Sequence, residues 1–217
     1  GGDVVKDQDT FDTWFSSGQW PFATLGYPDS KDFKTFYSTD VMETAGDIIF
    51  FWVSRMIMLG LYVTGEIPFK NVYLHGMVLD AKGQKMSKSK GNVIDPIVLT
   101  EKYGTDAFRL GMVVGNTPGT SLALAEDRIR GYGKFANKIW NATRFVLEQT
   151  KDFTPTPYDE EDAKSDEELK NFVTEITKEM DEFKFYIVAE KAYHYFWHTF
   201  ADVIIEESKT ILTGTDE

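Results

Sequence analysis

The sequence predicts an α/β domain followed by an all-α helical bundle. The run from Glu43 to Tyr62 is long enough for a helix and apolar on nearly every side, which is typical of a helix inside a large core. The segment Val72–Asp80, VYLHGMVLD, has the length and residue types of a buried strand. From Glu126 onward, apolar residues recur at steps of three and four, which is the stripe of an amphipathic helix.

Local signals place a turn and two helix starts after the predicted strand. Residues 81–84, AKGQ, supply the turn, so the lysine-rich segment that follows lies on a loop. Asp95 and Pro96 predict a helix with proline at its first position. Thr105 and Asp106 are expected to cap another helix, which continues through AFRLGMVV.

The remainder of the chain has a helical pattern with one interruption. Residues 151–168 combine two prolines with an acidic run, which predicts a solvated linker. We therefore divide the chain into an α/β domain, residues 1–125, and a helical bundle, residues 126–217. Beyond the linker, the apolar stripe is carried by Leu169, Phe172, Ile176, Met180 and the segment Tyr186–Lys209.

Composition excludes several classes of protein. With 217 residues, 42% of them hydrophobic and 15% aromatic, the chain can bury a core, so wholesale disorder is excluded. The absence of cysteine excludes disulfides and thiolate metal sites, and it fits the reducing cytoplasm, where we expect the protein. The formal net charge of -12 argues against sequence-blind binding of nucleic acid.

Membrane and metal sites are not expected either. The first residues show no basic start followed by an apolar stretch, so no signal peptide is visible. The most apolar run, Ile48–Tyr62, is interrupted by Ser54 and Arg55, and we expect it to be too short to span a bilayer. His194 and His198 are spaced as a helical pair, but zinc would need a third ligand, so no metal site is predicted.

A cluster of lysines stands out in this acidic chain. Four lysines lie between Lys82 and Lys90, with no acidic residue from Ala81 to Ile94. Lysines interrupted by serines, with Gly83 and Gly91 permitting close backbone approaches, suit a polyphosphate ligand. The segment lacks the glycine pattern of a Walker loop. The alternative is that these lysines are ordinary exposed charges on a turn.

The residues of this loop resemble a known family. Lys85–Ser89, KMSKS, matches the second signature motif of the class I aminoacyl-tRNA synthetases at all five positions, and GN, IDP and YGTDAFRL follow it. Three further blocks resemble the valyl members of the family: DTWFSSGQWPFATLGYP, GDIIFFWVSRMI and GYGKFANKIWNATRFV. The resemblance covers nearly the whole chain. It implies the second half of a Rossmann-like catalytic domain, followed by the start of a helical anticodon-binding domain.

The resemblance also implies an activity, ATP-dependent formation of valyl-adenylate and transfer of valine to tRNA(Val), with Mg2+ accompanying the ATP. Lys85 and Lys88 would stabilise charge on the leaving pyrophosphate. The residues implied in ATP binding are His75, Gly76, Met77 and Val78, for adenine, and Lys85, Ser87, Lys88 and Ser89, for the phosphates. The implied valine pocket consists of Trp14, Ile48 and Trp52, with Asp47 facing the ammonium group.

Purely structural roles are the alternative for several of these residues. His75 within an apolar strand could be a satisfied core histidine. Any buried helix could carry Trp52. Ile48 and Trp52 lie one α-helical turn apart, so they are expected to share a face.

The sequence departs from the family at one important motif. The first signature motif, HxGH, does not occur, and nothing corresponds to the family's editing domain. We therefore expect an internal piece that is inactive alone and needs the missing N-terminal half of the catalytic domain as a partner. Two alternatives are a regulatory or assembly partner and a non-catalytic tRNA-binding module. The latter would use Arg128, Arg130, Lys134, Lys138 and Arg144 as phosphate contacts.

Overall fold

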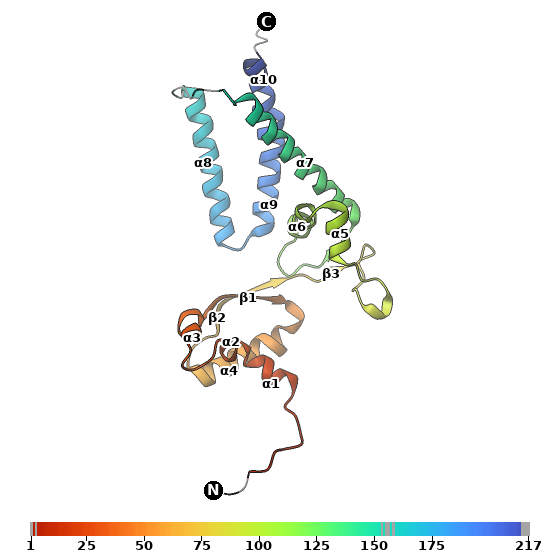
Figure 1. Cartoon of the computed structure of the whole chain (residues 1–217), viewed down its shortest axis with the longest axis vertical. Coiled ribbons are helices and arrows are strands. Elements are labelled where there is room, and N and C mark those ends of the chain that lie inside the picture. The colour runs from red at the N-terminus through yellow and green to blue at the C-terminus, as the bar shows by residue number, and fades with distance from the viewer. Residues whose placement is uncertain (1, 3, 153, 155–156, 158, 214–217) are drawn as a thin grey trace. The chain divides into compact units, whose positions relative to one another are not determined.

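The computed structural model describes residues 2, 4–152, 154, 157 and 159–213 (Figure 1). These residues form two compact units. The first unit runs to Met77 and takes in Pro118–Thr120, and the second holds Val78–Thr117 and the chain from Ser121 onward. The sequence-based division into two domains, residues 1–125 and 126–217, stays a prediction.

The first unit contains short helices, two strands and one long helical segment. Asp12 begins the first helix by accepting a hydrogen bond from the Trp14 amide at 2.8 Å. The elements in chain order are α1 (Thr13–Gly18), α2 (Trp20–Ala23), α3 (Lys31–Phe36), β1 (Thr39–Ala45), the 3-10 turn η1 (Gly46–Ile48), the π-helical η2 (Ile49–Val53), α4 (Ser54–Thr64) and β2 (Phe69–His75).

The strands β1 and β2 form a parallel two-stranded sheet, with Thr39 opposite Phe69 and Ala45 opposite His75. The helical segment η1–η2–α4 is the crossover that a parallel pair requires. It packs back on the sheet, so that strand and helix share one small core. The buried residues of this core are Met42, Val53, Met56 and Phe69.

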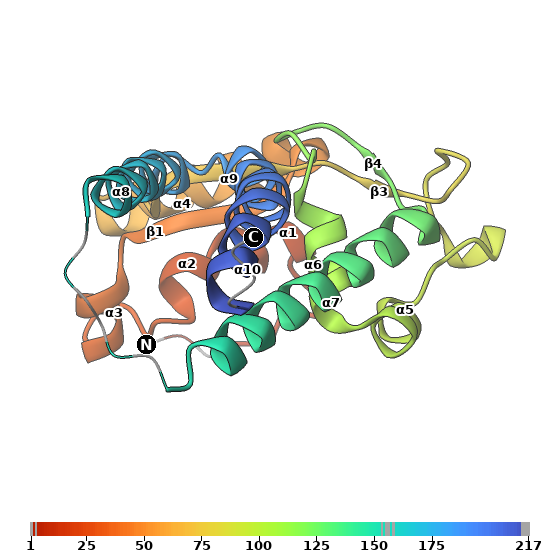
Figure 2. The same cartoon turned by 90° about the horizontal axis from the view of Figure 1, so that it is seen from above.

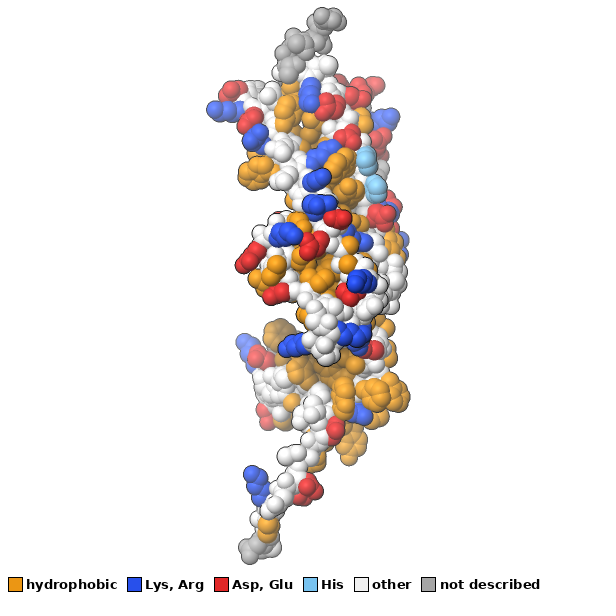
Figure 3. Space-filling view, turned by 90° about the vertical axis from the view of Figure 1, so that its right-hand side faces the viewer, with side chains coloured by type: hydrophobic (Ala, Val, Ile, Leu, Met, Phe, Trp, Pro, Cys, Tyr) orange, Lys and Arg blue, Asp and Glu red, His pale blue; other side chains and the backbone are white. Residues whose placement is uncertain are grey.

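Two sequence-based expectations about residues 43–62 are wrong. Glu43–Ala45 belong to β1, because their backbone pairs with β2. The helix that follows is not enclosed in a core: Val53 and Met56 are buried, but Phe50 is 74% and Tyr62 is 88% exposed. Only one face of the helix packs on the sheet and on α1 and α2. Apolar side chains gather accordingly on the surface of the first unit (Figure 3).

The expectation that this run is too short for a bilayer also needs correction. The helical stretch Gly46–Thr64 has 19 residues and is long and apolar enough to cross a membrane by length and composition. The core helix of a soluble protein passes the same test, and 17% of the most apolar window is buried here.

The second unit consists of a small strand pair, the lysine loop and a set of helices. The strands β3 (Val78–Leu79) and β4 (Leu122–Ala123) are parallel. The helical elements are η3 (Lys88–Lys90), α5 (Pro96–Tyr103), α6 (Thr105–Val113), α7 (Glu126–Gln149), α8 (Glu160–Asp181), α9 (Phe185–His194), the π-helical η4 (Tyr195–Ile204) and α10 (Ile205–Thr213).

The helix starts agree with the sequence in one case and differ in another. The carboxylate of Asp95 accepts a hydrogen bond from the Ile97 amide at 2.8 Å, so the predicted start of α5 is confirmed. The predicted cap of α6 is wrong, because Thr105 is already its first helical residue. Gly104 precedes it with φ +91°, a backbone conformation that glycine adopts without strain.

The predicted strand and the predicted linker are also shorter than expected. The strand over 72–80 is broken at Gly76 and Met77, between β2 and β3. The acidic part of the linker 151–168 is helical from Glu160 onward, because Asp159 and Asp162 form a capping box and acidic residues favour a helix N-terminus. Residues 153, 155, 156 and 158 of that linker lie outside the described residues.

The helices of the second unit share an aromatic core. In Figures 1 and 2, α8 lies beside α9, and α7 lies across the α9–α10 rod. The Phe135 ring of α7 stacks on Trp197 at 5.8 Å, and Phe172 of α8 stacks on Tyr195 at 4.4 Å. A second cluster, at the base of α7, buries Leu99, Ala107, Leu124 and Ile129.

Candidate functional site

The first unit gathers several predicted site residues at one edge of its sheet. Ala45 and His75 are paired at the carboxyl ends of β1 and β2. Asp47 and Ile48 follow β1 in η1, and Gly76 follows β2. Because parallel strands end at the same edge, these residues are close together, and such an edge is where open α/β sheets bind ligands.

His75 is placed at this edge by two polar contacts. Its Nδ1 lies 2.9 Å from the Gly76 carbonyl oxygen, and its Nε2 lies 3.4 Å from Oε1 of Glu43. The side chain is 42% exposed. His75 is therefore not a core histidine, and it orients Gly76, which is buried, at the end of the strand.

Trp52 connects the long helical segment to α1. Its indole N–H donates to the Ser17 carbonyl at 3.3 Å, and its ring is 6.3 Å from that of Trp20. The expectation that Ile48 and Trp52 share a face of one α-helix is not met. Ile48 ends a 3-10 turn and Trp52 belongs to a π-helical segment, so the 3.6-residue period does not relate them.

Trp14 lies on α1, and its surroundings include a residue that the sequence did not indicate. Its ring is 6.2 Å from that of Phe51. The Arg55 guanidinium lies 5.3 Å from the centre of the Trp14 ring and 5.8 Å from that of Phe51, a cation–π arrangement. Asp47 is exposed in η1, so the described valine-site candidates comprise two tryptophans, the half-buried Ile48 and one solvent-accessible carboxylate.

The second unit contains Val78 and the lysine loop, which begins as a tight turn. Leu79 and Lys85 form an antiparallel bridge. Between them, the Gly83 amide donates to the Asp80 carbonyl and the Asp80 amide to the Gln84 carbonyl, both at 2.9 Å. Gly83 has φ +75°, which a side chain would strain. The predicted turn at 81–84 is confirmed.

Asp80 braces this turn with its carboxylate. Oδ1 accepts from the amides of Lys82 and Gln84 at 2.9 and 2.8 Å, and Oδ2 accepts from the Asn92 side chain at 2.8 Å. These hydrogen bonds, that of Gln84 first, lower the pKa of the Asp80 carboxyl below its ordinary value, because they stabilise the charged form. Asp80 is thus an anionic brace at the base of a cationic loop.

The signature segment itself exposes its lysines. Lys85 and Lys88 are exposed, and within the part of the chain that the structure describes neither forms an ion pair. The hydroxyl oxygens of Ser87 and Ser89 are 3.2 Å apart, and the 3-10 turn η3 ends at Gly91 with φ +66°. The loop therefore presents two uncompensated cations on a hydrogen-bonded backbone, which suits an anionic ligand.

The cations suggested for tRNA contacts in the helices are mostly occupied. Arg130, Lys138 and Arg144 form ion pairs with carboxylates, at 2.8, 2.6 and 3.7 Å. Arg128 donates to the Val114 carbonyl. These contacts weaken the case for a pure tRNA-binding module, because a paired cation must leave its partner to bind phosphate.

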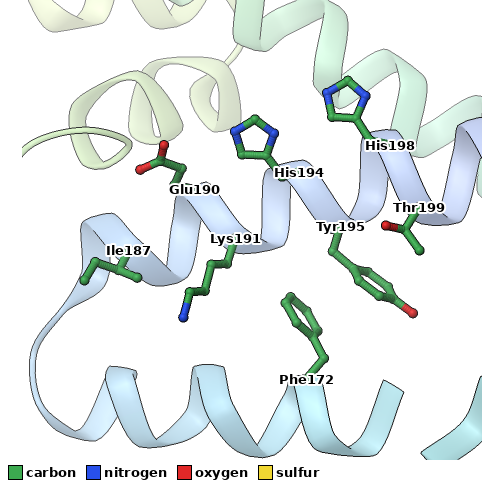
Figure 4. A pocket seen from close by; sticks show the side chains of 8 residues that line it. All are labelled: Phe172, Ile187, Glu190, Lys191, His194, Tyr195, His198 and Thr199. Carbon is green, nitrogen blue, oxygen red and sulfur yellow. The ribbon is translucent and has the colours of Figure 1, made fainter. Parts of the chain in front are cut away.

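One shallow pocket is lined mostly by residues of the α9–η4 rod, including His194 and His198, together with Phe172 of α8 (Figure 4). Lys191 reaches Glu175 and Glu179 of α8 at 2.6 and 2.9 Å. In Figure 4, His194 and His198 project from the other side of the helix. Among residues 159–213 and the rest of the described chain, no group of three or more metal-ligating side chains includes this pair.

The comparisons with family models cover most of the chain. Residues 1–124 match the model of the tRNA synthetases class I (I, L, M and V), and residues 162–217 match the anticodon-binding domain of tRNA ligase. Among curated proteins, the chain is 48% identical to the valine--tRNA ligase of Pelagibacter ubique over 223 residues, covering 99% of the chain and 25% of that protein. The corresponding protein of Solibacter usitatus is 45% identical, over 97% of the chain and 25% of its own length. The chain thus spans about a quarter of these relatives.

Solved structures share the fold. The LeuRS of Agrobacterium radiobacter, in a ternary complex with tRNA and LeuAMS, superposes with a TM-score of 0.75 at 21% identity, covering 93% of the chain and 29% of that structure. Methionyl-tRNA synthetase of Mycobacterium tuberculosis, bound by methionyl-adenylate, has a TM-score of 0.69 at 22% identity, over 83% of the chain and 37% of that structure. The predicted fold class, α/β followed by all-α, is confirmed.

Proposed function

The chain belongs to the class I tRNA synthetases of the isoleucine, leucine, methionine and valine group, and on that premise we propose that it is part of a valine–tRNA ligase. The activity would be the ATP-dependent conversion of valine to valyl-adenylate, followed by transfer of the valyl group to tRNA(Val) in the cytoplasm. The single observation that carries this proposal is the braced loop with exposed Lys85 and Lys88. The choice of valine rests on the relatives of 43–48% identity.

The first reaction needs a cationic loop for a clear reason. A carboxylate oxygen of valine attacks the α-phosphorus of ATP, and the bond from that phosphorus to the bridging oxygen of pyrophosphate breaks. Negative charge grows on the pyrophosphate, and a cation aimed at it stabilises the transition state more than the ground state. Lys85 and Lys88 would supply that charge, with Lys88 as the direct phosphate ligand. Ser87 and Ser89 would shape the loop.

The remaining predicted site residues would hold the rest of the substrates. Backbone groups of residues 75–78, which end β2 and begin β3, would receive adenine. Trp14, Ile48 and Trp52 would line the valine side chain, and Asp47 would face its ammonium group. Mg2+ would enter with the phosphates of ATP as part of the substrate.

Aminoacylation would also use the helical bundle. Residues 162–217 match the anticodon-binding family, which supports tRNA as a partner of this part of the chain. We propose that the chain alone does not activate valine at a useful rate. Catalysis needs groups that hold ATP against the loop, and the sequence contains no HxGH motif to supply them.

The test is valine-dependent exchange of pyrophosphate into ATP. The chain is assayed alone and with a supplied N-terminal half of the catalytic domain. We expect exchange only in the second case, and its loss in Lys88→Ala. Lys90→Ala is the matched control, since it removes the same charge from the same loop at a position outside the signature motif. No exchange in a folded, assembled complex would refute the proposal, and exchange dependent on isoleucine instead of valine would refute the substrate.

A further inference from the structure

The signature loop is closed at its base by a pair of side chains that are 12 residues apart in the sequence. Nδ2 of Asn92 donates to Oδ2 of Asp80 at 2.8 Å. Asp80 directly follows β3, and Asn92 follows Gly91 at the end of η3. Both side chains are half-buried, whereas Lys85 and Lys88 between them are exposed. We call Asp80 and Asn92 the loop clamp.

Asn92 also forms hydrogen bonds with the backbone of the lysine loop. Its Oδ1 accepts from the Ser87 amide at 2.9 Å, and its Nδ2 lies 3.3 Å from the Lys85 carbonyl oxygen. Only one orientation of the amide satisfies these partners, with the oxygen facing an N–H and the nitrogen facing two oxygens. One side chain therefore fixes residues 85–87 from both ends.

The residue enclosed by these contacts is anchored as well. The Ile94 amide lies 3.4 Å from the sulfur of Met86, which is half-buried and turned into the loop. The backbone on either side of Met86 is held by Asn92, and the turn before it is held by Asp80. The contacts hold the main chain and leave the lysine side chains to extend.

We infer that Asp80 and Asn92 are positioning residues, which fix the backbone of residues 85–87 so that Lys85 and Lys88 meet the phosphates of ATP in one arrangement. This inference rests on the proposed function. Neither residue needs to contact substrate. The clamp acts through the lysines, and a displacement of a reacting group by about 1 Å costs on the order of 100-fold in rate.

The hydrogen-bond pattern makes substitutions informative. Asn92→Asp keeps the size of the side chain but places an oxygen against Asp80 and against the Lys85 carbonyl, so it should open the clamp. Asp80→Asn with Asn92→Asp restores a donor opposite an acceptor, with the two roles exchanged. Asn116→Asp is the matched control, because it makes the same change at a half-buried asparagine of this unit, whose amide donates to the Met112 carbonyl at 3.1 Å.

The first measurement follows the clamp itself, in the full chain, by amide hydrogen exchange at Ser87. Asn92→Asp should accelerate amide hydrogen exchange at Ser87 at least tenfold, and the double variant with Asp80→Asn and Asn92→Asp should recover part of the protection. Asn116→Asp should leave the rate at Ser87 unchanged. Equal exchange at Ser87 in the parent chain and in Asn92→Asp would overturn the inference, since the clamp would then hold nothing.

The second measurement is valine-dependent exchange of pyrophosphate into ATP, in the complex of the chain with the supplied N-terminal half, expressed per titrated active site. Asn92→Asp should lower kcat by about 10- to 100-fold with the KM for valine unchanged. The double variant with Asp80→Asn and Asn92→Asp should regain part of the lost kcat. If Asn92→Asp retains the kcat of the parent while Lys88→Ala abolishes pyrophosphate exchange, this inference is overturned and the proposed function stands. Exchange that survives Lys88→Ala, or none in the parent complex, would refute the proposed function, and this inference with it.

Discussion

Gly91 offers a test of the loop that involves no charge and no catalytic group. It ends η3 in the left-handed region, at φ +66° and ψ 17°, and an added Cβ would meet nothing within 4 Å. Gly91→Ala would therefore carry a backbone cost without a steric clash. That cost is about 1–2 kcal/mol for an ordinary residue in this conformation.

The measurable consequence is more frequent opening of the loop. A cost of about 1–2 kcal/mol corresponds to a factor of about 5–30 in an equilibrium constant. When opening is fast relative to cleavage, proteolysis follows the population of the open form. We therefore expect trypsin to cut the chain after the loop lysines about 5- to 30-fold faster in Gly91→Ala, with the cut sites identified by mass spectrometry.

Two comparison variants separate the backbone argument from other causes. Gly91→Asn should be cut much more slowly than Gly91→Ala, because asparagine tolerates the left-handed region. Gly131→Ala lies within α7, where a Cβ also meets nothing within 4 Å, and it should leave loop cleavage unchanged. Equal cleavage of the alanine and asparagine variants at position 91 would refute the reasoning, since asparagine tolerates the left-handed backbone better than alanine does.

Three further predictions concern stability and pH. Ile129→Ala removes a fully buried side chain from the core at the base of α7 and should lower the free energy of unfolding by about 2–5 kcal/mol, as urea denaturation would show. A loss below 1 kcal/mol would mean that this core is not packed as described. Asp159→Ala removes the cap of α8 and should cost about 1 kcal/mol, whereas Asp159→Asn should retain most of the stability. For Asp80, whose folded pKa is lowered, the stabilisation of the loop is complete above the unfolded pKa of about 3.9 and is lost as pH falls through the lower folded value. Loop cleavage by pepsin should therefore rise in that window in the parent chain, and a pH profile identical to that of Asp80→Asn would contradict this.

Much of the site could be recognised because it is contiguous in the sequence. The KMSKS segment, the turn at 81–84 and the start of α5 at Pro96 all depend on neighbouring residues, and the structure confirms the turn and the helix start. The clamp partners were each visible but had no assigned role. Asp80 is the last residue of the predicted strand and Asn92 belongs to the GN flank, and only their hydrogen bond shows what they do together.

Errors occurred where a neighbour in space overruled a local pattern. Glu43–Ala45 looked helical because the apolar run continues through them, but their backbone pairs with residues 73–75 of β2. The linker predicted over Asp159–Asp162 is a different, local error, because carboxylates at this position cap a helix. Arg55 gave no signal as a functional neighbour, since its contact with Trp14 crosses from one helix to another.

The sequence by itself determined the fold class, the family, the helices of the bundle and the turn that begins the lysine loop. These follow from side-chain periodicity, turn chemistry and motif residues, all of which act over a few positions. The tertiary structure alone decided that β1 exists, that His75 lies half-exposed at a sheet edge and that Asp80 and Asn92 close the loop. Each of these depends on hydrogen bonds between residues distant in the chain, and a strand or a clamp has no partner until the backbone has folded to provide it.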